Sequence, residues 1–254
     1  MKALRFIFGG TFDPIHYGHI NPLQDLAQIF EIERIFLMPN KIPAHKNIAT
    51  ASQQQRVDML SLVCRENSIF NIEYFELNSS DISYTANTLA RINEQHKGQK
   101  LIFIMGADSW LGIESWYKYK ELVHNYHFIV IQRPLDNEQG KVTRDKSLVA
   151  VANKLALKYF WVSTEVKDQV SLAQEAWQHE RCSVTFCKLA LFDISSTEIR
   201  SFFKHGRDFA DNLATNMSID ETPLGQARKK LPQAVFEYVL AHQIYSSNDD
   251  AIDA

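Results

Sequence analysis

The sequence has few cysteines, no excess of basic residues and no apolar run long enough to span a bilayer. Among 254 residues there are three cysteines, and the formal net charge is -3. An odd number of cysteines without a regular spacing argues against a disulfide framework and indicates thiols in a reducing compartment, for which we expect the cytoplasm. The small negative charge argues against general attraction to nucleic acid or to an anionic membrane. Any phosphate-bearing ligand therefore needs a local site.

The N-terminal stretch MKALRFIFGG does not have the pattern of a targeting segment. Its apolar part is short and runs into Thr11, Asp13 and His16, so we expect neither a signal peptide nor a membrane span. The apolar content of 45% is ample for a packed core. We expect residues 1–245 to form one domain and residues 246–254 an acidic, flexible tail. The sequence leaves the oligomeric state open, a homo-oligomer included.

Short apolar runs alternate with segments of helical periodicity. This alternation is typical of βαβ units, so the sequence predicts an α/β fold with a mostly parallel sheet and helices on both faces. Ligands of such sheets bind beyond the carboxyl ends of the strands, where the loop 9–15 is expected. The expected strands are 3–8, 34–38, 71–77, 100–105, 127–132 and one or two within 183–192, and the expected helices are 16–30, 52–66, 84–97, 146–160 and 232–242.

The stretch FIFGGTFDPIHYGHI, residues 6–20, combines a glycine pair with two histidines three residues apart. Glycines after a buried strand allow the backbone to approach a ligand, although Gly9 and Gly10 also fit an ordinary tight turn. His16 and His19 would share one face near a helix N-terminus, where free N–H groups favour an anion. A structural histidine and a zinc pair are the alternatives, but no further ligand lies at zinc spacing nearby.

A second anion site is expected far along the chain, in FDISSTEIR, residues 192–200. Ser195 and Glu198 have the spacing of a capping box, which predicts a helix N-terminus at Ser195. Ser196, Thr197 and Arg200 then project from the first turns, so hydroxyl groups, free N–H groups and a guanidinium converge as polyphosphate binding requires. A capped helix with a surface arginine is the alternative reading.

Both segments resemble signatures of the nucleotidyltransferase superfamily: GGTFDPIHYGH at 9–19 and ISSTEIR at 194–200. Segments between them resemble bacterial nicotinate-nucleotide adenylyltransferase, namely MPNKIPAHK (38–46), SYTANTL (83–89), FIMGADSWLGIESWYKYKEL (103–122) and IQRP (131–134). The resemblance implies a Rossmann-like nucleotidyltransferase fold. It also implies adenylyl transfer from ATP to nicotinate mononucleotide, giving nicotinate adenine dinucleotide and pyrophosphate, a step in the biosynthesis of NAD.

The resemblance also implies site residues. Lys46 would pair with a phosphate as a mobile charge, and Trp116 would stack on the pyridine ring, although a loop lysine is commonly solvated and a tryptophan is commonly core. Mg²⁺ would arrive with the phosphates of ATP, with Asp108 binding one of its waters or a ribose hydroxyl and no dedicated metal site in the protein. The implied catalytic residues are His16, His19, Lys46 and Arg200; those for ATP are Gly9, Gly10, Thr11, Phe12, His16, His19, Gly106, Asp108, Ser195, Ser196, Thr197 and Arg200; those for the acceptor are Asp13, Lys46, Ser83, Tyr84, Thr85, Trp116 and Arg133.

Alternative functions remain open at this point. A related adenylyltransferase could use nicotinamide mononucleotide or phosphopantetheine, and a nucleotide-binding sensor would perform no chemistry. The histidine pair argues against the sensor, because backbone groups and arginine suffice for binding alone. The chain departs from the family pattern at Asn87, where relatives often have Asp, and in the extended connections 136–182 and 204–230.

Overall fold

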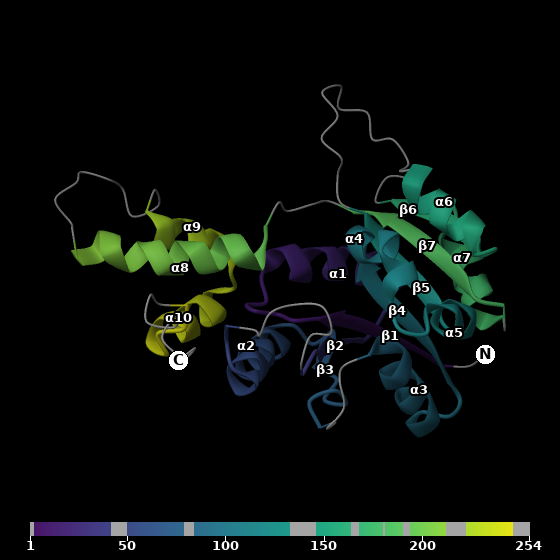
Figure 1. Ribbon diagram of the computed structural model, residues 1–254, viewed down its shortest axis with the longest axis horizontal. Helices are drawn as coiled ribbons and strands as arrows, with labels where there is room; N and C mark the ends of the chain where they lie inside the picture. Colours follow the sequence, from purple (N-terminus) through teal and green to yellow (C-terminus); the bar gives the residue numbers. More distant parts are fainter. Residues whose placement is uncertain are drawn as a thin grey trace.

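The chain folds around one parallel sheet, shown in Figure 1. The computed structural model describes residues 3–41, 50–78, 84–132, 146–163, 168–179, 181–189, 194–211 and 222–245. Within these residues the sheet has seven strands in the order β3-β2-β1-β4-β5-β7-β6, and every neighbouring pair is parallel. The strands are β1 (Ala3–Gly10), β2 (Ile35–Pro39), β3 (Phe70–Ile72), β4 (Gln99–Gly106), β5 (His127–Gln132), β6 (Lys158–Ser163) and β7 (Ser183–Lys188).

Helices cover both faces of this sheet, as predicted. Neighbouring residues of one strand point to opposite faces, so Phe6 and Ile7 belong to two different hydrophobic clusters. One cluster packs against α1 (Tyr17–Phe30), α2 (Gln53–Glu66), α7 (Val170–Gln178), α8 (Ser196–Asp211), α9 (Pro223–Lys230) and α10 (Gln233–Ala241). The other packs against α3 (Thr85–Gln95), α4 (Ala107–Leu111), the 3-10 helix η1 (Ile113–Ser115), α5 (Tyr119–Asn125) and α6 (Lys146–Lys154).

Several helix boundaries follow from the sequence. The helices expected at 16–30, 52–66 and 84–97 are confirmed as α1, α2 and α3. Ser52 begins α2 with a complete capping box, because its hydroxyl accepts from the Gln55 N–H and the Gln55 side chain accepts from the Ser52 N–H. The expected final helix at 232–242 is α10, with Pro232 as its N-cap.

The prediction of a continuous helix over 146–160 was wrong. Helix α6 ends at Lys154, and β6 begins at Lys158. The N–H of Leu157 bonds to the carbonyl of Ala152, and Ala156 between them has a φ of 54°. That left-handed cap commonly carries Gly, so an alanine there gives no sequence signal of a helix end.

Other elements also differ from expectation. The strand expected at 71–77 ends at Ile72, because residues 75–78 form a turn, and the strand expected at 183–192 is β7, which ends at Lys188. The connections at 136–182 and 204–230 carry the unpredicted α7 and α9 as well as α6, β6 and the end of α8. Helix α9 contacts α8, and the Nζ of Lys230 lies 3.0 Å from a carboxylate oxygen of Glu198 in the first turn of α8.

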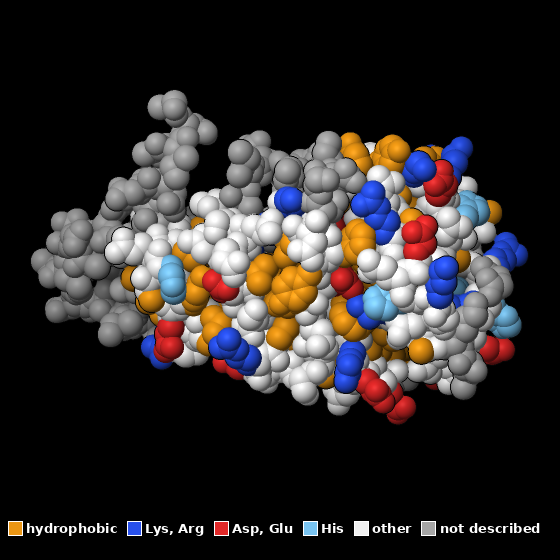
Figure 2. Space-filling model, turned by 90° about the horizontal axis from the view of Figure 1, so that it is seen from below, with side chains coloured by type: hydrophobic (Ala, Val, Ile, Leu, Met, Phe, Trp, Pro, Cys, Tyr) orange, Lys and Arg blue, Asp and Glu red, His pale blue; other side chains and the backbone are white. Residues whose placement is uncertain are grey.

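The outer elements lie at opposite ends of the molecule. In Figure 1, α8, α9 and α10 gather at one end near the C-terminus, whereas β6, β7, α6 and α7 lie at the other. Figure 2 shows one face, on which basic and acidic side chains are interspersed with apolar ones rather than collected into a field of one sign. Within the described ranges, every helix is too short or too polar to cross a membrane.

Trp177 joins α7 to the sheet and to α1, and its removal should be costly. Its indole is fully buried, with ring centroids 5.7 Å from Phe6 and 4.9 Å from Phe30. We expect Trp177→Ala to lower the free energy of unfolding by about 3–5 kcal/mol, measured by urea denaturation. Leu172→Ala, on the exposed side of the same helix, should change it by less than ~0.5 kcal/mol. Equal losses would contradict this placement of Trp177.

Candidate active site

The candidate site lies where the order of the strands reverses. From β1 the chain continues to β2 and β3 on one side, and β4 then returns to pair with the other side of β1. At such a switch point the loops after the two central strands separate and leave a crevice. The loop from Thr11 to His16 follows β1, and α4 follows Gly106, the last residue of β4. Both are segments that the sequence analysis assigned to nucleotide binding.

The loop after β1 is built around Phe12. This residue has a φ of 52° and a buried side chain, whose ring lies edge-on to His19 at 5.4 Å. A Cβ at Gly10 would lie 2.9 Å from the Phe12 ring, so glycine leaves the room that the ring needs. Phe12 was assigned to ATP binding; its side chain packs beneath His19, whereas its backbone belongs to the loop. The aromatic ring of Phe12 thus restricts the position of the His19 ring by packing against it.

The two histidines stack on each other at the start of α1. His16 is the N-cap, and its carbonyl accepts from the N–H groups of His19 and Ile20. The two imidazole centroids are 3.8 Å apart, with an angle of 28° between the ring planes. His16 is buried and His19 is half-buried. The pair lies at a helix N-terminus, where the helix dipole favours an anion.

Gly18 allows this stacking and also brings the second motif close. A Cβ at this position would lie 2.9 Å from two atoms of the His16 ring and 3.1 Å from the carbonyl oxygen of Ile194. Ile194 lies just before α8. The glycine between the two histidines is therefore needed for packing on two sides, a requirement that the sequence analysis did not identify.

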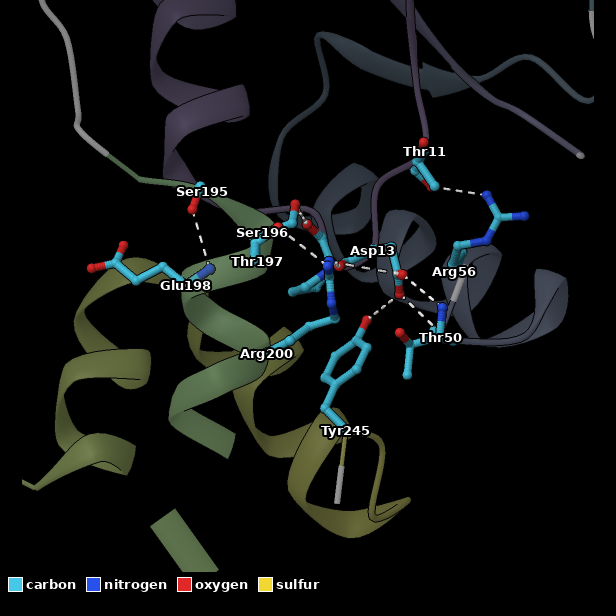
Figure 3. Close-up of polar contacts among 12 residues, drawn as sticks. Thr11, Asp13, Thr50, Arg56, Ser195, Ser196, Thr197, Glu198, Arg200 and Tyr245 are labelled. Atoms are coloured by element: carbon cyan, nitrogen blue, oxygen red, sulfur yellow. Dashed lines mark hydrogen bonds and ion pairs between the residues drawn. The ribbon is translucent and has the colours of Figure 1, made fainter. Parts of the chain in front are cut away.

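The second motif docks directly on the first, as Figure 3 shows. One guanidinium nitrogen of Arg200, Nη1, donates to the carbonyl of Asp13 at 2.8 Å, although 187 positions separate the two residues. The hydroxyl of Ser196 donates to the carbonyl of Pro14 at 3.1 Å. The structure thus brings together the two segments that the sequence marked as anion sites.

The first turn of α8 has the expected cap. The hydroxyl of Ser195 accepts from the N–H of Glu198 at 3.1 Å, and α8 begins at Ser196. The Nη2 of Arg200 donates to the hydroxyl of Thr197 at 3.2 Å. Ser195 and Thr197 are exposed, whereas Ser196 and Arg200 are partly buried. These donors lie at the free N-terminus of a long helix, an arrangement suited to phosphate oxygens.

Asp13 accepts several hydrogen bonds from distant parts of the chain. Its Oδ2 accepts from the N–H of Thr50 at 2.8 Å, and its Oδ1 accepts from the N–H of Ala51 at 3.0 Å and from the hydroxyl of Tyr245 at 2.8 Å. The Nη1 of Arg200 lies 3.9 Å from Oδ2. From the sequence, Asp13 was expected to bind the acceptor; in the structure its carboxylate is bound by three protein donors.

Two further residues of this cluster were missed from the sequence. Tyr245 is buried, and Arg56 is only 2% exposed, with its Nη1 donating to the carbonyl of Thr11 at 2.8 Å. Burial lowers the pKa of Arg56, while Asp13 and Tyr245 act in the opposite direction. A single Arg in an amphipathic helix and a single Tyr after the last helix match no motif. The burial of Arg56 and Tyr245 marks them as part of this cluster, and that burial is created only by the fold.

Three of the predicted acceptor residues, Tyr84, Thr85 and Trp116, belong to the segments that cover the other face of the sheet. The helix expected at 84–97 is α3, which starts at Thr85, and the ring of its N-cap Tyr84 lies against that of Tyr117, with centroids 4.6 Å apart and an angle of 34° between the planes. Trp116 is half-buried and lies edge-on to Phe103 of β4 at 6.4 Å. Three other predicted site residues, Lys46, Ser83 and Arg133, lie outside the described residues.

Asp108 is exposed in the first turn of α4, directly after Gly106 at the carboxyl end of β4. Such a carboxylate can accept from a water or a hydroxyl of a ligand in the crevice. No cluster of three or more His, Cys, Asp or Glu side chains that could hold a metal ion occurs in the described parts of the chain.

Comparison with known proteins shows the family of the chain. The family model described as cytidylyltransferase-like matches residues 7–202, and the chain therefore belongs to the cytidylyltransferase-like family of nucleotidyltransferases. Within it the chain is a member of the nicotinate-nucleotide adenylyltransferases. The one from Shewanella frigidimarina is 32% identical over 241 residues, which cover 94% of this chain and 98% of the relative. The one from Salmonella typhimurium is 42% identical over 135 residues, covering 53% of this chain and 63% of the relative.

A solved structure shares the fold. Nicotinic acid mononucleotide adenylyltransferase of Plasmodium falciparum, complexed with NaAD, superimposes with a TM-score of 0.65 at 19% identity, and the alignment covers 96% of this chain and 97% of that chain. The expected fold class, a Rossmann-like nucleotidyltransferase fold, is confirmed.

Gly18→Ala tests the packing between the two motifs. Because the new Cβ would press against the His16 ring and the Ile194 carbonyl, we expect the free energy of unfolding to fall by about 1–3 kcal/mol in urea denaturation. Gly112→Ala is the matched control, because its Cβ meets nothing closer than 3.6 Å. That control should leave stability unchanged or slightly raised. A tolerated Gly18→Ala would show that the two motifs are not packed this closely.

Proposed function

We propose that this chain transfers the adenylyl group of ATP to nicotinate mononucleotide and releases pyrophosphate, and that this occurs at the site formed by the two motifs. The observation that carries the proposal is the bond from Arg200 to the Asp13 carbonyl, because it joins the two predicted phosphate-binding segments into one site. Relatives named nicotinate-nucleotide adenylyltransferase support the acceptor. The single sheet supports residues 1–245 acting as one catalytic domain.

The reaction needs positioning and charge neutralisation rather than a covalent intermediate. An oxygen of the acceptor phosphate attacks the α-phosphorus of ATP, and the bond from that phosphorus to the bridging oxygen of the pyrophosphate breaks in line. In this proposal, His16, His19, Lys46 and Arg200 face the phosphates, and His19 and Arg200 stabilise the charge that develops on the oxygens. The stacked histidines are held in place by Phe12 and Gly18 before ATP binds, so little reorganisation is needed.

The remaining residues have proposed binding roles. The backbone of Gly9, Gly10, Thr11 and Phe12 and the N-terminus of α8 with Ser195, Ser196 and Thr197 would hold ATP, with Gly106 and Asp108 beside its ribose. Asp13, Lys46, Ser83, Tyr84, Thr85, Trp116 and Arg133 would form the acceptor side. Free N–H groups at the start of α3 suit the nicotinate carboxylate, and Trp116 suits the pyridine ring.

Mg²⁺ fits this donor set as a companion of ATP. Bound to the triphosphate, it would supply neutralisation of the phosphate charge. Asp108 would hold one of its waters, because its exposed carboxylate lies at the carboxyl end of β4. The histidine pair and Arg200 would then need to neutralise only the remaining charge.

The cysteines support a cytoplasmic enzyme without a thiolate nucleophile. All three are free thiols. Burial raises the pKa of Cys64 to about 11 and raises that of Cys187 further, so both keep their protons at neutral pH. Buried thiols of this kind suit a reducing compartment. The oligomeric state, a homo-oligomer included, is a question for solution measurements.

His19→Ala tests the proposed catalytic role of the histidine pair. If the imidazole meets charge mainly in the transition state, kcat should fall on the order of a hundredfold or more while the KM for ATP changes little. Release of pyrophosphate with ATP and nicotinate mononucleotide is the measurement. His205→Ala, an exposed histidine on α8, should behave as wild type. A folded His19→Ala protein with normal kcat would leave the histidine a structural role only.

The acceptor preference tests the predicted pyridine pocket. Nicotinate mononucleotide carries a carboxylate that the N–H groups of α3 can bind, whereas nicotinamide mononucleotide carries a neutral amide. We expect the higher kcat/KM with the nicotinate compound under identical conditions. Trp116→Ala should raise the KM for the acceptor roughly tenfold and leave that for ATP nearly unchanged. Equal or reversed preference in wild type would refute the nicotinate pocket even if adenylyl transfer occurs.

A further inference from the structure

We propose that Tyr245 is a positioning residue of the active site, through which the segment after the last helix holds the phosphate-binding loop in place. The inference rests on the proposed function and extends it to a residue outside both signature motifs. The hydroxyl of Tyr245 donates to Oδ1 of Asp13 at 2.8 Å, across 232 positions of the chain. Figure 3 shows this ring rising from the end of the C-terminal helical segment toward Asp13.

The Asp13 carboxylate needs all of its donors because it is buried. Only 5% of the residue is exposed, and the two oxygens accept from Thr50, Ala51 and Tyr245. A buried carboxylate is tolerated when such bonds replace those it made to water. Of these three donors, Tyr245 supplies the side-chain hydroxyl and the other two are backbone N–H groups. Its hydrogen bond replaces one that the Asp13 carboxylate would make to water.

Through its bonds Asp13 links both halves of the proposed site. Thr50 and Ala51 directly follow the segment 42–49, which contains Lys46, and directly precede α2. The Asp13 carbonyl receives Arg200 from the start of α8. One residue of the first loop therefore binds Thr50 and Ala51 on one side and the proposed triphosphate ligand Arg200 on the other.

Loss of the Tyr245 hydroxyl should redirect Arg200. The guanidinium Nη1 already lies 3.9 Å from Oδ2 of Asp13. With one donor removed, the buried carboxylate attracts this guanidinium more strongly, because a charged donor forms the stronger bond. A guanidinium drawn onto Asp13 is less available to the phosphates of ATP. The hydroxyl of Tyr245 thus keeps Arg200 in position without touching substrate.

Tyr245 can act only as a donor here. Burial raises the pKa of Tyr245 well above its ordinary value, and the neighbouring Asp13 carboxylate raises it further, against the opposing effects of Arg200 and Arg56. The hydroxyl therefore keeps its proton at any pH at which the enzyme would work. Ionisation of Tyr245 therefore does not break its hydrogen bond to Asp13 in that pH range.

The chain offers a matched control on α10. The hydroxyl of Tyr238 donates to Oδ2 of Asp58 on α2 at 2.7 Å, so it also ties the C-terminal region to a carboxylate. Asp58 belongs to neither motif and to no proposed ligand set. Tyr238→Phe and Tyr245→Phe each remove one hydroxyl and keep the ring, but only Tyr245→Phe removes a donor from Asp13.

The test compares wild type, Tyr245→Phe, Tyr238→Phe, Asp13→Asn and the double variants of Asp13→Asn with each tyrosine change. Release of pyrophosphate gives kcat and both KM values, and thermal unfolding gives the melting temperature. We expect Tyr245→Phe to raise the KM for ATP roughly tenfold, with a smaller rise for the acceptor, and Tyr238→Phe to leave both unchanged. The effects of Tyr245→Phe and Asp13→Asn on kcat/KM should be strongly non-additive, whereas those of Tyr238→Phe and Asp13→Asn should add.

Amide hydrogen exchange supplies a readout that does not depend on activity. The N–H groups of Thr50 and Ala51 should exchange faster in Tyr245→Phe than in wild type, and should be unaffected in Tyr238→Phe. Kinetic losses that follow the melting temperature in both tyrosine variants, additive effects with Asp13→Asn, or a Tyr245→Phe protein that does not fold would each overturn the positioning role. Wild-type protein that releases no pyrophosphate would instead refute the proposed function, and the exchange result would still decide whether Tyr245 holds the loop.

Discussion

The buried carboxylate of Asp13 is the constraint on which the candidate site depends. A buried charge must be bonded, and this one collects donors from the segment before α2 and from the C-terminal segment. Its own carbonyl and that of Pro14 bind the start of α8. Residues from the beginning, middle and end of the chain thereby meet at one loop. The arrangement of the proposed phosphate-binding segments therefore depends on the bonds that this single group makes.

The sheet explains why the loop can serve as that meeting point. The loop leaves β1 at the switch point, with β4 on one side and β2 on the other. Alternating side chains of the strands pack against helices on both faces, with α1 and α8 in one hydrophobic cluster and α3 and η1 in the other. The proposed site residues therefore come from segments on both faces of the sheet.

The sequence predicted the elements that carry strong local signals. The histidine spacing, the Ser195 cap and the periodicity of α1, α2 and α3 are local signals, each contained in a short stretch of sequence. The fold class follows from the order of the predicted elements. What it missed depends on contacts between distant residues or on unusual caps. Tyr245 and Arg56 gain meaning only when burial places them beside Asp13 and Thr11. The start of β6 was hidden because Ala156 occupies a left-handed cap that usually carries glycine.

The central claim is that the two distant motifs form one triphosphate site. A crystal structure with Mg²⁺ and a non-hydrolysable ATP analogue tests it most directly. The phosphates should lie between His19 and the N-terminus of α8, within hydrogen-bond distance of Arg200, with the bond between Tyr245 and Asp13 intact. A triphosphate held by only one of the two motifs, or bound away from the carboxyl edge of β1 and β4, would contradict it.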